Sequence, residues 1–96
     1  MRAVIDGSAV KDERDVHKQL SEQLDFGPYY GWNRAALWDR LSTDVARPVE
    51  IVWQDADASR RTLGAETFDA LVAILARAEA QDREFGWVDV LTVQMA

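Results

Sequence analysis

The sequence contains no cysteine, and this absence excludes several classes of protein at once. Disulfide-stapled domains, thiolate zinc sites and enzymes with a cysteine nucleophile all require that side chain. The chain also lacks an apolar run approaching the ~20 residues that a membrane-spanning helix needs, so we expect no membrane association through such a helix. An acid and a glycine follow the first residues too soon for a secretory signal peptide, and we therefore expect a cytoplasmic protein.

Side chains that commonly carry catalysis are scarce as well. The single histidine, His17, lies beside Val16 and one turn before Leu20, and we interpret it as a structural or surface residue rather than a general base. The chain has no phosphate loop of the Walker type and no dinucleotide-binding fingerprint. Its serines have no partnering base in any motif. The sequence therefore predicts a protein that is not an enzyme and has no catalytic residues.

Two acidic pairs are the remaining candidates for a metal site. They are Asp55 with Asp57, and Asp82 with Glu84. Neither pair has the glycine and the distal glutamate of a calcium loop. We attribute them to helix capping and to solvation, and we expect no metal site and no cofactor.

What the chain has in excess is negative charge. Seventeen Asp and Glu side chains against eleven Lys and Arg give a net charge of -6. This balance argues against a direct nucleic-acid binder that works by neutralising phosphates, and against docking on an anionic membrane. It favours a basic protein partner. The 96 residues, 48% of them hydrophobic, are enough for one globular domain, residues 1–96.

Hydrophobic patterns, together with residues that start and end helices, predict an alternation of strands and helices. We expect strands at 3–5, 49–53 and 87–93, and helices at about 13–25, at about 34–44, between Asp55 and Gly64, and at about 67–81. The order is strand, helix, helix, strand, helix, helix, strand. Because strands separated by helical crossovers usually pair in parallel, the sequence predicts an α/β fold with a three-stranded parallel sheet and helices packed on it.

Segment 29–44 is the most informative part of the chain. It opens with an aromatic loop, in which Asn33 is suited to cap the following helix. In that helix Leu37 and Leu41 point to the core. Four other residues share a separate face at the spacing i, i+3, i+4 and i+7: Ala35, Trp38, Asp39 and Ser42. That face has no large aliphatic residue.

Aromatic side chains around a carboxylate, with small residues that permit close approach, are typical of the centre of a protein interface. The residues that we expect to contact a partner are Tyr29, Tyr30, Gly31, Trp32, Asn33, Ala35, Trp38, Asp39 and Ser42. For the side chains of Tyr30 and Trp53 we favour a position at the edge of the core. For Tyr29 and Trp38 the pattern alone leaves core and interface equally open.

Several motifs resemble the barstar family of intracellular ribonuclease inhibitors. They are Tyr-Tyr-Gly-x-Asn at 29–33, Ala-Leu-Trp-Asp-x-Leu at 36–41, Pro48 before a strand that ends in Trp53, Ala-Val-Ile-x-Gly at 3–7 and Asp-x-His-x-x-Leu at 15–20. The similarity covers residues 1–53 without a gap and weakens afterwards, although the order of elements still matches. The resemblance implies a barstar-like α/β domain, with four helices packed on the three-stranded parallel sheet.

The resemblance also implies a function. It is the non-covalent inhibition of a basic microbial ribonuclease of the barnase type, in a 1:1 complex inside the producing cell, by a protein that is a monomer when free. Such an enzyme must hold the scissile phosphate with cationic side chains, and Asp39 is the carboxylate implied to take the place of the phosphate oxygens. Tyr29 and Trp38 are implied as flanking contacts, while Gly31 and Asn33 shape the loop.

Three positions depart from the family pattern. Ala35 and Trp32 occupy positions at which the family pattern has acids. Our alignment of the fourth helix places Arg77 at the position of a glutamate that contacts the partner in the family pattern, with Glu79 nearby. The binding face therefore has fewer acids than the pattern. An alternative function is consequently an immunity or regulatory binding module, on the same scaffold, for a different toxin or a partner that is not a ribonuclease.

Overall fold

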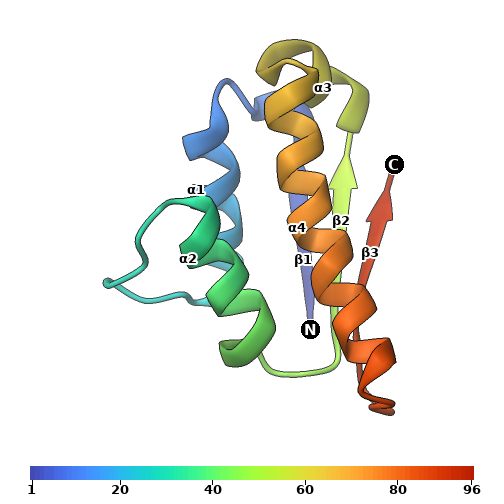
Figure 1. Ribbon diagram of the computed structural model, residues 1–96. Coiled ribbons are helices and arrows are strands. Elements are labelled where there is room, and N and C mark those ends of the chain that lie inside the picture. Colours follow the sequence, from blue (N-terminus) through green and yellow to red (C-terminus); the bar gives the residue numbers. More distant parts are fainter.

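The computed structural model covers residues 1–96 and consists of three strands and four α-helices. The elements are β1 (Arg2–Asp6), α1 (Glu13–Leu24), α2 (Arg34–Asp39), β2 (Val49–Gln54), α3 (Ala56–Leu63), α4 (Ala65–Glu84) and β3 (Leu91–Met95). A 3₁₀ turn, η1 (Gly7–Ala9), follows β1, and a π-helical turn, η2 (Arg40–Asp44), continues α2. Helix α4 runs in front of the sheet, and α1 and α2 lie to one side of it (Figure 1). No helix combines the length and the apolar composition that crossing a bilayer requires.

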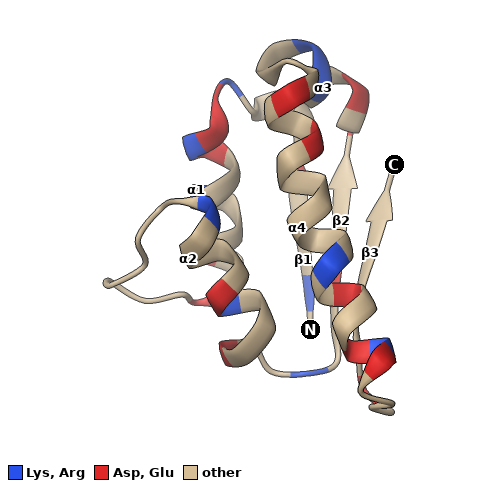
Figure 2. Cartoon of the chain, in the orientation of Figure 1, with Lys and Arg blue, Asp and Glu red and all other residues tan.

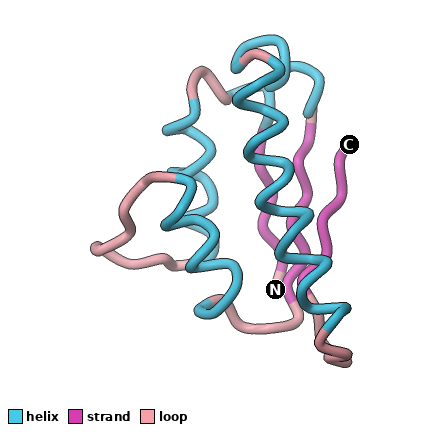
Figure 3. The backbone as a smooth tube through the Cα atoms, viewed as in Figure 1, coloured by secondary structure: helices cyan, strands magenta, loops and turns pink.

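The predicted α/β fold is confirmed. The sheet has the order β1-β2-β3, and both pairs of neighbours are parallel. In its register Ala3 lies opposite Ile51, which lies opposite Val93. Figure 3 shows the three strands side by side, with helices in the segments that connect them.

The core lies between the sheet and the helices. In the central strand, Val49 and the three consecutive residues Ile51, Val52 and Trp53 are buried. The predicted core residues Leu37 on α2 and Leu41 on η2 are both buried, and so are Val16, Leu20 and Leu24 on α1. On α4 the side chains of Leu71, Leu75 and Ala78 are buried, and those of Phe68 and Val72 are half-buried. Removing these apolar side chains from water is the main force that holds the helices on the sheet.

The first two helices begin at capping side chains, and the second of these is the predicted cap Asn33. The side chain of Asp12 accepts a hydrogen bond from the backbone N–H of Asp15 at 3.1 Å. The third start differs, because Asp55 has left-handed backbone angles (φ 51°, ψ 44°) and its side chain forms no capping bond. A capping side chain reaches the first turn from an extended backbone, so the predicted cap at Asp55 was wrong.

The predicted last strand also began too early. Helix α4 continues to Glu84, and Gly86 with φ of 73° turns the chain after it. The N–H of Trp87 then bonds the carbonyl of Asp82 at 3.4 Å, which keeps this stretch with the helix end rather than the sheet. Strand β3 therefore begins at Leu91.

Side chains of α1 complete the hydrogen bonds along the free edge of β1. Gln19 Oε1 accepts from the N–H of Asp6 at 2.7 Å, and its Nε2 donates to the carbonyl of the same residue at 3.2 Å. Gln23 bonds the N–H and the carbonyl of Val4 in the same manner, both at 2.7 Å. The two amides thus occupy backbone groups that would otherwise be open to pairing with another strand.

Acidic side chains of α4 accept hydrogen bonds from the free edge of β3 in a similar way. The N–H of Val93 donates to Glu79 at 2.9 Å, and the N–H of Leu91 donates to Asp82 at 2.7 Å. Asp82 is 1% exposed and pairs with Arg47, so our attribution of this acid to solvation was wrong. Helices thus bond the outer backbone of both edge strands of the small sheet.

Candidate protein-binding site

The loop before α2 projects from the body of the molecule, beside the exposed side of that helix (Figure 1). Tyr29 is 90% exposed in this loop, whereas its neighbour Tyr30 is only 4% exposed. The two tyrosines therefore have different roles. Tyr29 is available to a partner, and Tyr30 belongs to the core, where its ring packs 4.7 Å from that of Phe26.

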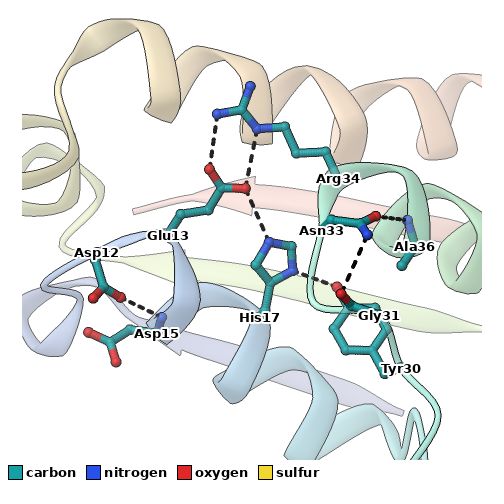
Figure 4. Close-up of polar contacts among 9 residues, drawn as sticks. All are labelled: Asp12, Glu13, Asp15, His17, Tyr30, Gly31, Asn33, Arg34 and Ala36. Atoms are coloured by element: carbon teal, nitrogen blue, oxygen red, sulfur yellow. Dashed lines mark hydrogen bonds and ion pairs between the residues drawn. The ribbon is translucent and has the colours of Figure 1, made fainter.

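A polar network holds the loop on α1 (Figure 4). The buried ring of His17 is at its centre, with Nδ1 2.5 Å from the hydroxyl of Tyr30 and Nε2 3.2 Å from Glu13. Glu13 in turn accepts two hydrogen bonds from Arg34, at 2.9 and 3.2 Å. The network thus connects α1 with the loop and with the first residue of α2, and His17 is the structural histidine that we predicted.

Charge and burial shift the protonation equilibria of this network. The hydrogen bonds from Arg34, together with that from His17, lower the pKa of Glu13 although partial burial opposes the shift. The same contact raises the pKa of Arg34. Burial raises the pKa of Tyr30, and the nearby charge of Glu13 adds to the effect. Glu13 and Arg34 therefore remain charged, and Tyr30 neutral, at neutral pH.

Asn33 and Gly31 fix the turn into α2, as expected. Asn33 Oδ1 accepts the N–H of Ala36 at 2.8 Å, and its Nδ2 donates to the carbonyl of Gly31 at 3.4 Å. A Cβ atom on Gly31 would lie 3.3 Å from the Cβ of Ala36. Glycine therefore lets the loop lie tightly against the start of the helix.

Trp32 is oriented by its neighbours rather than free. Its backbone has φ of 56°, a left-handed conformation, and its side chain is half-buried. The indole packs 6.0 Å from the ring of Tyr30, and the guanidinium of Arg14 lies over it at 4.5 Å. Arg14 is a part of this surface that we did not predict, because it lies at the start of α1, at the opposite end of that helix from the loop.

Two residues of the predicted face of α2, Asp39 and Trp38, line separate hollows. Ala35 is exposed and Ser42 half-buried. Asp39 lines a hollow of about 370 Å³ on the loop side, which Tyr29 and Gly31 also line. Trp38 is half-buried on the other side and lines a hollow of about 290 Å³ against α4. The structure thus brings Asp39 together with Tyr29, and places Trp38 beside α4.

Asp39 differs from the other charges near it. Its neighbour Arg40 pairs with Asp44 at 2.9 Å, and Arg34 pairs with Glu13. The carboxylate of Asp39 is exposed and forms no ion pair or hydrogen bond with the protein. Figure 2 shows this mixture of acidic and basic positions along α2 and the adjoining part of α4.

Comparison with known proteins supports the resemblance seen in the motifs. The family model described as Barstar (barnase inhibitor) matches residues 1–92. The chain belongs to the barstar family. The match extends through α3 and α4 into β3, well beyond residues 1–53 that our motifs covered.

A relative of the chain comes from Bacillus subtilis (strain 168) and is named "Putative ribonuclease inhibitor YrdF". It is 34% identical over 84 residues, which are 88% of this chain and 92% of that protein. The two chains therefore correspond over nearly their whole lengths. The barstar family assignment covers every element that carries the candidate site.

Proposed function

We propose that this protein inhibits a microbial ribonuclease by occupying its active site. Membership of a family described as barnase inhibitors, and a relative named as a ribonuclease inhibitor, support the proposal. The observation that carries it is the carboxylate of Asp39, which is exposed on α2 and unpaired. It shares a hollow with Tyr29, the most exposed aromatic residue of the chain.

The proposed mechanism follows from the chemistry of the target. An enzyme that cleaves RNA must hold an anionic phosphate with cationic side chains, and Asp39 presents two oxygens to the same groups. Arginine holds a carboxylate through paired, charge-assisted hydrogen bonds. Because Asp39 forms no ion pair in the free protein, no internal contact has to be broken for this exchange. Tyr29 and Trp38 flank the carboxylate and exclude water from the contact.

The site is prepared before the partner arrives. The bonds of Glu13 with Arg34, and of His17 with Tyr30, fix the loop and the start of α2 on α1. A surface that is already ordered loses little conformational entropy on binding, and this favours affinity. Gly31, Trp32, Asn33, Ala35 and Ser42 then contribute shape around the contacts rather than charge.

The partner in this proposal is a basic microbial ribonuclease, bound non-covalently in a 1:1 complex. The inhibitor acts in the cytoplasm of the producing cell, where it is a monomer when free, and it performs no catalysis of its own. Its net charge of -6 accelerates encounter with a basic enzyme, so association is faster at low ionic strength.

The test is a titration of RNA cleavage by a panel of secreted guanyl-specific ribonucleases at low salt. We expect activity to fall linearly to zero at one equivalent of inhibitor for the matching enzyme. Asp39→Asn should weaken binding at least about 100-fold, because a buried cation of the enzyme loses its charged partner. Glu22→Gln is the matched control, since it removes one exposed acid on the outer side of α1. Equal inhibition by the Asp39 variant and the control would reject the phosphate-mimic mechanism.

A second candidate function is an immunity or regulatory module directed at a different partner. The observations that favour it are Ala35, Trp32 and Arg77 at positions where the family pattern has acids. Pull-down from the native host separates the two functions. Capture of a protein that is not a nuclease, together with no effect on RNA cleavage, would replace the ribonuclease proposal.

A further inference from the structure

Most charged side chains around α2 form ion pairs with one another, and only a few are unpaired. Arg34 is neutralised by Glu13 and Arg40 by Asp44, each pair at 2.9 Å. These four side chains therefore contribute little net charge to the face. The binding properties of the face depend on the charged groups that have no partner within the protein.

Arg77 on α4 is such an unpaired group. Its guanidinium carbon lies 4.1 Å from the centre of the Trp38 ring, and it forms no ion pair or hydrogen bond with the protein. The side chain is exposed. Stacking on an indole restrains the flexible arginine stem while leaving the N–H groups of the guanidinium free. Arg77 is therefore a cation held in position with its hydrogen-bonding capacity unused.

The hollow beside this stack is suited to a protruding side chain. It has a volume of about 290 Å³ and is lined by Trp38, Arg77, Ala80, Gln81 and Glu84. Glu84 is the only acid in the lining, and it lies two helical turns from Arg77, about 10 Å along the axis. The acid does not pair with the guanidinium. An approaching carboxylate therefore meets Arg77 without competition from within the protein.

We propose that Arg77, stacked on Trp38, is a second recognition element that binds a carboxylate of the partner enzyme. This inference rests on the proposed ribonuclease-inhibitor function. The binding face then has two parts of opposite sign: Asp39 meets the basic phosphate cleft, and Arg77 meets an acidic residue on its rim. Arg77 selects among ribonucleases, because an enzyme with a cation at that rim position meets a like charge.

The experiment uses the ribonuclease that the wild-type protein inhibits most tightly in the panel above. The dissociation constant is measured for wild type, Arg77→Gln and Arg77→Glu. We expect a graded loss, about tenfold for glutamine and about 100-fold for glutamate, because the first removes an attraction and the second adds a repulsion. Arg61→Glu is the matched control: it makes the same change in net charge at an exposed position on α3. Its effect should stay within about threefold.

A purely structural role for Arg77 gives a different pattern. If the arginine only supported Trp38, the glutamine and glutamate variants would lose affinity equally, and both would lose unfolding free energy in urea. That result would overturn the inference, and so would an Arg77→Glu variant that binds as tightly as wild type. A charge swap gives the decisive positive result: replacing an acid on the rim of the enzyme's cleft by lysine restores binding of Arg77→Glu.

The two proposals fail in distinguishable ways. If the wild-type protein inhibits no ribonuclease in the panel, the proposed function fails, and the recognition role of Arg77 fails with it. If wild type inhibits and Asp39→Asn does not, yet the charge at position 77 has no effect, only the second recognition element is rejected.

Discussion

The Nε atom of Arg47 lies 2.6 Å from Oδ2 of Asp82, and the two side chains are 10% and 1% exposed. The same carboxylate accepts the N–H of Leu91 at 2.7 Å, where β3 begins. The guanidinium also donates to the carbonyls of Leu41 and Val45, at 2.6 and 2.7 Å. One buried ion pair thus joins the end of η2, the last turn of α4 and the first residue of β3.

Replacement of Asp82 tests the energetic importance of this junction. Asp82→Asn preserves the shape of the side chain but leaves the buried cation of Arg47 without its counter-charge. We expect the free energy of unfolding to fall by about 3–5 kcal/mol. The measurement is urea denaturation, with Glu84→Gln as the control because Glu84 is exposed on the same turn. A loss below about 1 kcal/mol would show that solvent reaches this pair.

Asp82 also predicts that the stability of the protein depends on pH. Burial alone would raise the pKa of Asp82, but the hydrogen bonds from Arg47 and Leu91 lower the pKa by more than burial raises it. The pKa of Asp82 in the folded protein therefore lies below the ordinary value of 3.8. The folded protein therefore releases this proton more readily than the unfolded chain. Its stabilising contribution is complete above that ordinary value and is lost as the pH falls through the lower, folded-state pKa.

Urea titrations between about pH 3 and pH 6 measure this linkage. We expect the unfolding free energy of the wild type to decline more steeply toward acid than that of Asp82→Asn. Glu13 also has a lowered pKa, and its contribution is common to both proteins. Parallel curves for the two proteins would mean that Asp82 is not the group responsible.

The same substitution is expected to destabilise the protein at Tyr30 but not at the adjacent Tyr29. Tyr30→Phe removes the hydroxyl that bonds the buried ring of His17, and we expect a loss of about 1–3 kcal/mol in unfolding free energy. Tyr29→Phe should leave stability unchanged, because that side chain is 90% exposed. Urea denaturation of both variants makes the comparison. Equal stabilities would contradict the assignment of Tyr30 to the network that holds the loop.

Much of the fold could be predicted because its signals are local. Apolar spacing located the helices α1, α2 and α4 and the first two strands, and the extended backbone before α1 and α2 matches the caps at Asp12 and Asn33. The errors arose where backbone conformation overrides residue type. Asp55 is a good capping residue in a left-handed conformation, and β-branched residues near Val88 lie in a turn that follows Gly86.

The site was predicted only in part, because its electrostatics depend on long-range contacts. The spacing within α2 placed Trp38 on one face with Asp39, whereas in the structure Trp38 lies half-buried against α4 and Asp39 lies beside Tyr29. It did not show that α4 places Arg77 on the ring of Trp38, or that α1 places Arg14 on Trp32. Contacts between residues that are far apart in sequence leave no periodic pattern within either segment, so the sequence pattern does not reveal them.

The edge of β1 provides the last prediction. Gln23 forms two 2.7 Å hydrogen bonds with the backbone of Val4, so Gln23→Ala leaves one N–H and one carbonyl of an edge strand unpaired. We expect a loss of about 1–2 kcal/mol in unfolding free energy, and increased self-association, because exposed strand edges pair with other chains. Denaturation and light scattering at increasing protein concentration measure the two effects. The control is Glu22→Ala, which truncates the neighbouring exposed side chain without touching the strand. If the Gln23 variant matches this control in both measurements, the glutamine amides do not protect the edge.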